Sequence, residues 1–343
     1  MVLGLCFLLA VAGILYLNRA SIFAWISEEQ AEREAWEQYL QRQEKIDTSV
    51  FEEVAKTAVI KKQLTLEIPE GILPDEITIS NDYLTRTIRI SIPHVADSYF
   101  TGQPLSGRSD NITQLSYAHE KEGDVIMITT DYVYELDISH DEHYFYIDFL
   151  KPHEIYEHVV VIDAGHGGRD PGANRKGVEE KDIDLGIALE LKALFEASEE
   201  KIGVYYTRTD DSNPTNTERV NLANKTNADL FISIHINSYK GNRDTSINGT
   251  EVMYHTLQEK GFTSKRLAQI CMEELTAALG SKDRGLVDGD SIFIINQSKV
   301  PVALVEVGFI TNKEERELLS TKDYQKKTAE GLYKAILRAL GEK

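Results

Sequence analysis

The 343-residue sequence contains little cysteine and little positive charge. Its two cysteines, Cys6 and Cys271, lie in an N-terminal apolar run and in a predicted helix. We therefore expect no disulfide between them and a fold that does not depend on one. The chain has 37 Lys and Arg side chains against 56 Asp and Glu, which gives a formal net charge of -19. Nucleic-acid binding requires clustered Lys and Arg, so the composition argues against a nucleic-acid partner.

A long apolar segment lies at the N-terminus, and no Lys or Arg precedes it. Residues 2–17 are apolar, glycine or tyrosine, polar residues interrupt the run within 18–21, and apolar residues resume over 22–26. A membrane-spanning helix requires about 20 mostly apolar residues, with a lower limit near 17. Residues 1–26 are therefore predicted to form a membrane anchor, with a cleaved signal peptide as the alternative.

Two regions of different composition follow the apolar segment. Residues 27–52 are charged and helix-prone, which predicts a helical stalk. Residues 53–155 alternate apolar and polar side chains in short runs such as TRTIRISI and YFYIDF, with turn signals between them. This period of two is typical of half-buried antiparallel strands. Residues 53–155 are therefore predicted to form a small β-rich accessory domain.

Strands and helices alternate in the remainder of the chain, residues 156–343. After a first strand that begins at Val159, further strands are predicted at 202–207, 230–235, 250–255, 291–295 and 302–307, and helices at 182–195, 217–227, 264–279 and 323–340. This alternation predicts an α/β domain in which a mostly parallel sheet is covered by helices on both faces.

Three of these predicted strands bring side chains capable of metal or acid–base chemistry to their ends. The run VVVI leads into a glycine-rich turn that carries His166, the strand LFISIH ends in His235, and the strand VALVEV carries Glu306. The carboxyl ends of strands in an open α/β sheet form the edge at which ligands bind. The sequence therefore predicts a metal hydrolase site at this edge.

A third metal ligand is expected near the two histidines, because zinc hydrolases commonly use three protein ligands and leave one position for water. Glu180 is the best-placed candidate, since it stands at the start of a predicted helix after the loop that leads from His166. Glu179 is adjacent, and spacing alone does not separate the two carboxylates. Glu306 is then left for acid–base catalysis.

Each of these side chains also has an interpretation without function. A single histidine at a strand end is more often a hydrogen-bonded surface or core residue, whereas a carboxylate in an apolar strand, such as Glu306, is seldom buried unless it is paired. The joint pattern of three strand ends is stronger than any of its members. A competing cluster, the HDEH segment at 140–143, falls between two predicted strands and is better interpreted as a solvated hairpin turn.

The region 159–340 resembles the zinc-dependent N-acetylmuramoyl-L-alanine amidases that trim bacterial cell walls. The resemblance is carried, in the order of the family, by VIDAGHGGRDPGA, EKDIDL, TRTDD, ERVNLAN, ADLFISIHINS, GTEV, DRGL and VALVEVGFITN. It implies that one zinc ion is held by His166, Glu180 and His235, and that Glu306 is the catalytic glutamate. The family glutamate precedes a Lys or a similar residue, here Lys181, and this resolves the choice between Glu179 and Glu180.

The resemblance also implies a substrate and a location. The substrate is peptidoglycan, cleaved at the amide between the lactyl group of N-acetylmuramic acid and the L-alanine of the stem peptide. The catalytic domain then lies outside the cytoplasmic membrane, anchored by residues 1–26 or secreted after signal cleavage, and residues 53–155 are similar to modules that target some of these amidases to the wall. A protein regulator of unknown identity is a further possible partner.

Two rival functions have to be weighed against the amidase interpretation. A zinc peptidase also uses two His and one Glu, and a wall-binding protein with a degenerate site requires no catalysis. The motif set argues against the first rival, and retention of all four site residues argues against the second.

The sequence departs from the family pattern at two positions. Asp184 stands where the family usually has Asn, and Ser238 stands where Ala is frequent, but neither is a metal ligand.

Overall fold

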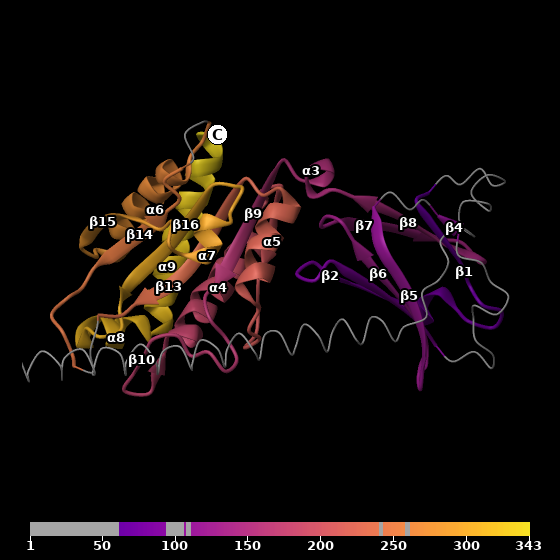
Figure 1. Cartoon of the computed structure of the whole chain (residues 1–343), viewed down its shortest axis with the longest axis horizontal. Coiled ribbons are helices and arrows are strands. Elements are labelled where there is room, and N and C mark those ends of the chain that lie inside the picture. The colour runs from indigo at the N-terminus through magenta and orange to yellow at the C-terminus, as the bar shows by residue number, and fades with distance from the viewer. Residues whose placement is uncertain (1–61, 94–105, 108–110, 240–242, 258–260) are drawn as a thin grey trace, which may run out of the picture.

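The computed structural model describes residues 62–93, 106–107, 111–239, 243–257 and 261–343. The predicted membrane segment 1–26 and stalk 27–52 lie outside the described residues. Within the described part of the chain, no helix is both long and apolar enough to cross a bilayer. Figure 1 shows a β part and an α/β part side by side, with the short helix α3 (Pro152–Ile155) between them in the chain.

The β part consists of two four-stranded antiparallel sheets, ordered β4-β1-β8-β7 and β2-β3-β6-β5. Its elements are β1 (Leu64–Glu67), the 3₁₀ helix η1 (Pro74–Glu76), β2 (Thr78–Asp82), β3 (Thr87–Pro93), β4 (Ser106–Gly107), β5 (Ile112–Glu120), β6 (Gly123–Thr130), β7 (Glu135–His140) and β8 (Tyr144–Leu150). Alternate apolar side chains of both sheets, among them Leu66, Ile90, Ile126 and Ile147, share one core. The two sheets therefore form a β-sandwich, the architecture that the period of two favours.

A six-stranded sheet ordered β12-β9-β13-β16-β14-β15 forms the centre of the α/β part. Its strands are β9 (His158–Ala164), β12 (Ile202–Tyr206), β13 (Leu230–Asn237), β14 (Thr250–Tyr254), β15 (Asp283–Asp288) and β16 (Val302–Phe309), and a small hairpin of β10 (Asn174–Arg175) and β11 (Val178–Glu179) lies outside the sheet. β14 runs antiparallel to β16, and β15 runs parallel to β14. The sheet is therefore mixed, and the prediction of a mostly parallel sheet is wrong.

The reversal at β14 follows from the connection that precedes it. A parallel neighbour requires a crossover connection, usually with a helix. The described residues between β13 and β14 contain no helix, so the chain re-enters the sheet in the opposite direction. The predicted strand at 291–295 is also wrong, because Phe293–Asn296 form the short helix α7. A short apolar run of this length does not distinguish a strand from a buried helical turn.

Helices cover both faces of the sheet, as the sequence predicted. On one face, α4 (Glu180–Glu196), α6 (Ser264–Leu279) and α9 (Lys322–Gly341) pack on the even-numbered residues of β9 and β13. On the other face, α5 (Asn216–Thr226) and α7 pack on Val161, Phe231 and Leu304. A further short helix, α8 (Lys313–Leu319), follows β16 (Figure 1). Both faces of β9, β13 and β16 are thus buried, which explains why these strands are almost uniformly apolar.

The two parts of the molecule make direct contact. Val133, which precedes β7, is 1% exposed and belongs to the same apolar cluster as Val159 and Val161 of the α/β part. Its backbone N–H donates to the carbonyl oxygen of Lys225 at 3.1 Å. The hydroxyl of Tyr205, in β12, donates to the carboxylate of Glu135. The β-sandwich is therefore docked on the α/β part through apolar contact and hydrogen bonds.

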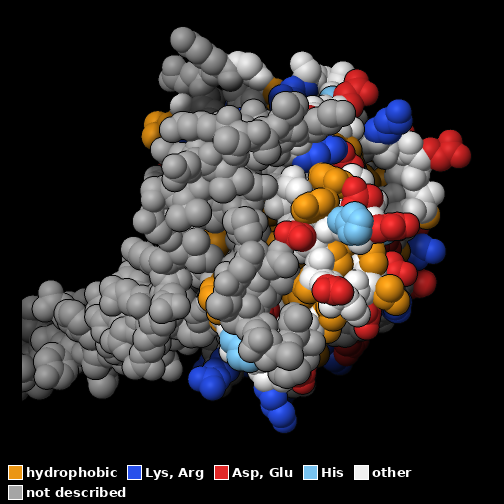
Figure 2. Space-filling model, turned by 90° about the vertical axis from the view of Figure 1, so that its right-hand side faces the viewer, with side chains coloured by type: hydrophobic (Ala, Val, Ile, Leu, Met, Phe, Trp, Pro, Cys, Tyr) orange, Lys and Arg blue, Asp and Glu red, His pale blue; other side chains and the backbone are white. Residues whose placement is uncertain are grey.

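The end of the molecule that lies on the right in Figure 1 is shown in Figure 2. Among the side chains drawn in colour, acidic and hydrophobic groups are interspersed, and Lys and Arg lie mainly towards the margins of the view. Part of the acidic excess of the sequence is thus exposed to solvent on this face.

Candidate metal centre

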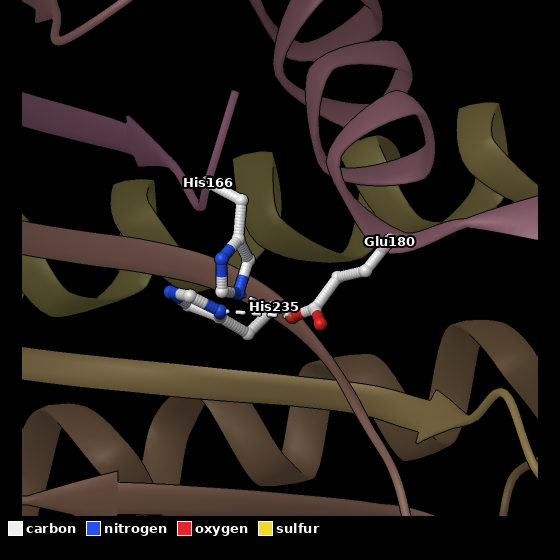
Figure 3. Close-up of side chains that lie close together, drawn as sticks. All are labelled: His166, Glu180 and His235. Carbon is white, nitrogen blue, oxygen red and sulfur yellow. Dashed lines mark hydrogen bonds and ion pairs between the residues drawn. The ribbon is translucent and has the colours of Figure 1, made fainter. Parts of the chain in front are cut away.

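Three elements bring the predicted metal ligands together at the carboxyl edge of the sheet. His166 follows β9, Glu180 is the first residue of α4, and His235 lies near the end of β13. Figure 3 shows the two imidazole rings and the carboxylate converging on one point. One potential ligand atom from each residue lies within 4.8 Å of the others.

The separations between these atoms fit ligands of a single metal ion. His166 Nε2 lies 3.2 Å from Glu180 Oε1, and His235 Nδ1 lies 2.9 Å from the same oxygen. Two atoms bound tetrahedrally to one zinc ion at the usual bond lengths lie about 3.3 Å apart. Two nitrogens and one carboxylate oxygen are also a donor set that zinc accepts in hydrolases. The residues present therefore fit a zinc ion.

Glycines keep space open beside these side chains. A Cβ atom on Gly165 would lie 2.4 Å from Cε1 of His235, and one on Gly172 would lie 2.6 Å from Oε2 of Glu180. His166 itself has φ 56, a left-handed conformation that is uncommon for a residue with a side chain. Such conformations persist only where the surroundings hold them, and they are frequent at functional sites.

Glu180, and not Glu179, faces the two histidines. It is 4% exposed, its Oε1 accepts from the backbone N–H of Ile236 at 3.0 Å, and its Oε2 accepts from the N–H of Ala173 at 2.6 Å. These two backbone donors fix the orientation of the carboxylate. Glu179 instead ends the β10–β11 hairpin and accepts from the side chain of Asn174 at 3.2 Å. Glu180 lies next to both imidazoles because the helix begins at this residue.

The electrostatics of the cluster favour a bound cation. Burial opposes the charge of Glu180, but hydrogen bonds from His166 and His235 outweigh burial and hold the pKa of its carboxyl well below the usual range. Burial likewise opposes the charge of the His166 ring, but Glu180 and Asp170 outweigh it and raise the pKa of this imidazole to about 9. The buried carboxylate is therefore ionised and has to be paired with positive charge, which protons or a metal ion can supply.

Glu306 lies beside this cluster, in a row of side chains across three strands. It pairs in register with His235 of β13 and with Glu251 of β14. Its Oε2 atom is buried and has no hydrogen-bond partner among the described residues. Burial raises the pKa of the Glu306 carboxyl to about 7, where the nearby imidazoles partly oppose the increase. A carboxyl group with a pKa near neutrality can both accept and return a proton.

A β-bulge follows directly after this row. His235 pairs with Glu306, but Asn237 pairs with Phe309, so β16 contains one residue more than β13 over this stretch. Bulges of this kind redirect a strand and are common next to active sites. The side chain of Asn237 donates to Glu251 at 2.9 Å beyond the bulge.

Two further carboxyl groups lie around the site: Asp170, which the sequence interpretation did not single out, and Asp184, which it noted only as a departure from the family pattern. Asp170 Oδ2 lies 2.8 Å from Nδ1 of His166, which leaves Nε2 facing Glu180. An acidic residue four positions after the histidine was the available signal. Asp184 is fully buried, neither of its carboxyl oxygens has a hydrogen-bond partner among the described residues, and burial raises its pKa well above the usual range.

The competing HDEH segment lies elsewhere. His140 ends β7, Tyr144 begins β8, and the residues between them form the connecting turn. All four side chains are exposed. Asp141 accepts from the backbone N–H groups of His143 and Tyr144, both at 2.8 Å, as turn residues commonly do. The structure therefore places this segment in a solvated hairpin turn, away from the metal cluster.

Comparison with known proteins shows to which family this arrangement of residues belongs. Residues 160–338, about half of the chain and all four candidate site residues among them, match the family described as N-acetylmuramoyl-L-alanine amidase. The chain belongs to this family. Its α/β part is accordingly the hydrolase domain of a peptidoglycan amidase, and the predictions of the family and of the enzyme class are confirmed.

Individual relatives cover the same region. The uncharacterized protein YqiI of Bacillus subtilis (strain 168) is 38% identical over 178 residues, which are 52% of this chain and 82% of that protein. The N-acetylmuramoyl-L-alanine amidase LytC of the same organism is 38% identical over 177 residues, but these are only 34% of LytC. The crystal structure of an N-acetylmuramoyl-L-alanine amidase from Clostridium difficile 630 aligns with a TM-score of 0.51 and 34% identity over 54% of this chain and 98% of that one.

Proposed function

We propose that this amidase hydrolyses the bond between the lactyl group of N-acetylmuramic acid and the L-alanine of peptidoglycan stem peptides, with one zinc ion held by His166, Glu180 and His235. Glu306 acts as the general base. The observation that carries the proposal is the convergence of three ligand atoms within 4.8 Å beside a carboxyl group that has an unpartnered buried oxygen. Membership of the amidase family supports the choice of bond.

The role of each group in the proposed reaction follows from its surroundings. Zinc, when bound, supplies a Lewis acid that polarises the amide carbonyl and increases the acidity of water. Asp170 holds the His166 ring at Nδ1, so that Nε2 stays directed at the centre. The two backbone N–H groups on Glu180 hold its carboxylate in place. These residues are thus oriented before any substrate arrives.

Glu306 moves the protons. Its carboxylate accepts a proton from the attacking water and then donates it to the amine of the departing L-alanine, which leaves the carboxyl group ready for another cycle. A pKa of about 7, raised by burial, suits both transfers near neutral pH. The unpartnered Oε2 atom supports this role, because no hydrogen bond within the described protein has to be broken before it can accept a proton.

A zinc peptidase remains the rival that the ligand set alone does not exclude. The match to the amidase family favours the amide on the sugar side of the stem peptide. Digestion of purified cell wall by the protein, with and without a chelator, separates the alternatives. We expect new L-alanine amino termini that disappear with the chelator and return with added zinc. Amino termini formed within the stem peptide would instead identify a peptidase.

The likeness to LytC and to the amidase family supports action outside the cytoplasmic membrane, where peptidoglycan lies. We further propose that residues 1–26 anchor the chain, that 27–52 form a stalk, and that residues 53–155 form an accessory domain that holds the catalytic domain 156–343 at the wall. Protease added to intact wall-less cells should degrade the globular part if the placement is correct. Protection of that part from the protease would contradict it.

A further inference from the structure

The turn that carries His166 contains little regular structure to hold it. It spans Gly165 to Gly168, and His166, Gly167 and Gly168 all have positive φ angles, of 56, 133 and 53. The N–H of Gly165 still donates to the sheet, at Ile234. Gly167 pairs with Asp170 through both its backbone N–H and its carbonyl oxygen. The carbonyl oxygens of Gly165 and His166 instead accept hydrogen bonds from two buried arginines.

Arg208 connects the turn to the start of α4. It follows β12 and is 3% exposed. Its Nε donates to the carbonyl of Ala164 at 3.0 Å, and its Nη2 donates to Gly165 at 2.6 Å and to Lys181 at 2.9 Å. Lys181 directly follows Glu180. One guanidinium thus fixes the segment before His166 relative to the helical turn that carries the carboxylate ligand.

Arg219, on α5, holds the same turn from the other side. It is also 3% exposed. Its Nη2 donates to the carbonyl of His166 itself at 2.6 Å, and its Nη1 donates both to the carbonyl of Ala164 and to Oδ1 of Asp163 at 2.6 Å. Asp163 stays ionised despite complete burial, because Arg219 and the hydroxyls of two neighbouring residues keep its pKa low.

A third link lies at the exposed rim of the turn. Asp211 Oδ1 accepts from the backbone N–H of Gly168 at 3.0 Å and from Nζ of Lys181 at 3.0 Å. Lys181 Nζ also donates to the carbonyl of Gly168 at 2.9 Å. The turn and the beginning of α4 are therefore connected on the surface as well as in the interior. The side chain of Asp211 is 59% exposed, so this link can be changed without disturbing the core.

We infer that Arg208, Arg219 and, at the exposed rim, Asp211 are positioning residues for the metal centre. The two arginines hold His166 in its left-handed conformation, and Arg208 and Asp211 connect the turn to the start of α4 that carries Glu180, so all three residues set the affinity for the metal. The inference rests on the proposed metal centre. A buried guanidinium is costly to desolvate, and carbonyl oxygens compensate its charge only partly. Removing outer partners of metal ligands typically weakens metal binding about 10–100-fold.

The test measures zinc affinity by competition with a chromophoric chelator, in the full-length protein and its Arg208→Lys and Arg219→Lys variants. Lysine keeps the charge but cannot reproduce the planar fork that reaches two carbonyls. We expect the dissociation constant for zinc to rise about 10–100-fold in each variant. Urea unfolding of the metal-free proteins measures the accompanying change in stability.

Arg316 provides a matched control. It is 7% exposed and lies on α8. Its Nη1 donates to the carbonyl of Ile310 at 2.8 Å and to Asp244 at 3.1 Å, and among the described residues its guanidinium donates to neither the turn at 165–168 nor the start of α4. Arg316→Lys should lose comparable stability and bind zinc like the unmodified protein. Zinc affinity equal to that of the unmodified protein in both Arg208→Lys and Arg219→Lys would overturn the inference, and so would an equal loss in Arg316→Lys.

If the variants at the buried arginines do not fold, the zinc affinity of the Asp211→Asn protein tests the inference instead. Because the side chain is exposed, we expect an unchanged free energy of unfolding with weaker zinc binding. Unchanged zinc affinity in this variant would overturn the inference in that case. Failure of the unmodified protein to bind zinc is a different result, since it would contradict the proposed function and not the role of the arginines.

Discussion

The β-sandwich and the α/β part bury different kinds of side chain. Among the described residues of the sandwich, the buried ones are almost all apolar, and the polar exceptions are Ser116, Asp124 and Thr130. In the α/β part, the buried set includes charged groups that gather near one edge of the sheet, namely Asp163, Glu180, Asp184, Arg208 and Arg219. The two parts contact each other through Val133 and Glu135, yet this difference in burial persists across the contact.

The difference separates what folding requires from what chemistry requires. An apolar core is sufficient for the sandwich, because burial of apolar surface is the main source of stability. Buried charges contribute little net stability and often reduce it. Their concentration around His166 and Glu180 therefore reflects the metal centre. Changes at the edge of the α/β sheet should affect catalysis first, and changes in the sandwich should affect stability alone.

The largest effect is expected from the metal ligands. His166→Ala, Glu180→Ala and His235→Ala should each lower the zinc content sharply and abolish wall cleavage, since three protein ligands are the minimum for such a site. Metal analysis measures the zinc content, and a wall-digestion assay on the same preparations measures the cleavage. Glu179→Ala is the matched control, and it should retain zinc and activity. Stoichiometric zinc in the Glu180→Ala protein would remove this residue from the ligand set.

Replacement of the general base should have the next largest effect. Glu306→Gln keeps the shape of the side chain and removes its ability to accept a proton, so wall cleavage should fall at least about a hundredfold. Zinc content and wall binding should remain normal. If Glu306 only completed a buried polar network, the variant would instead lose stability and keep most of its specific activity. Zinc content, melting temperature and cleavage, measured on one preparation, distinguish these outcomes.

The same substitution should change how the stability of the metal-free protein depends on pH. The pKa of Glu306 is raised from 4.5 to about 7 in the folded state, so the folded protein keeps a proton that the unfolded chain loses. The contribution of Glu306 to the free energy of unfolding is therefore fully present below pH 4.5 and is lost as the pH rises through about 7. Between pH 5 and 8, Glu306→Gln should gain up to about 3 kcal/mol relative to the unmodified protein. Parallel stability–pH curves of the two proteins would contradict this expectation.

The smallest effect on catalysis is expected from the core of the sandwich. Leu66 is fully buried there, and Leu66→Ala should lower the free energy of unfolding by about 2–5 kcal/mol. Cleavage and zinc content per folded molecule should not change. Leu332→Ala, at an equally buried position in α9, is the matched substitution in the α/β part. A loss of specific activity in the Leu66→Ala protein would show that the sandwich shapes the catalytic site.

Much of the site was visible in the sequence because it lies at strand ends. An apolar run followed by a glycine-rich turn locates His166, and a carboxylate within an apolar strand marks Glu306. Spacing could not choose between Glu179 and Glu180. That choice depends on where α4 begins and on a hydrogen bond from Ile236, which is distant in the chain. The position at the start of the predicted helix favoured Glu180, and only the resemblance to the amidases resolved the choice.

The direction of β14 and the role of the two buried arginines could not be predicted from the sequence, and each has a physical reason. The direction of β14 is invisible in the sequence, because side chains alternate between the two faces of a strand in the same way whichever direction the strand runs. Arg208 and Arg219 occur in polar segments that resemble solvated surface, and their burial results from carbonyl groups that other segments of the chain supply. Such long-range hydrogen bonding leaves no local pattern.

The bulge between β13 and β16 has a consequence for how the sequence of this enzyme can vary. Side chains alternate between the faces of a strand, so an insertion or deletion of one residue before Glu306 would turn its carboxyl group to the opposite face, away from His235. The extra residue of β16 comes only after this pair, where it leaves their register intact. Length changes should therefore be confined to the loops and to the far side of the bulge, whereas the strand segments that lead to His235 and Glu306 must keep a constant length.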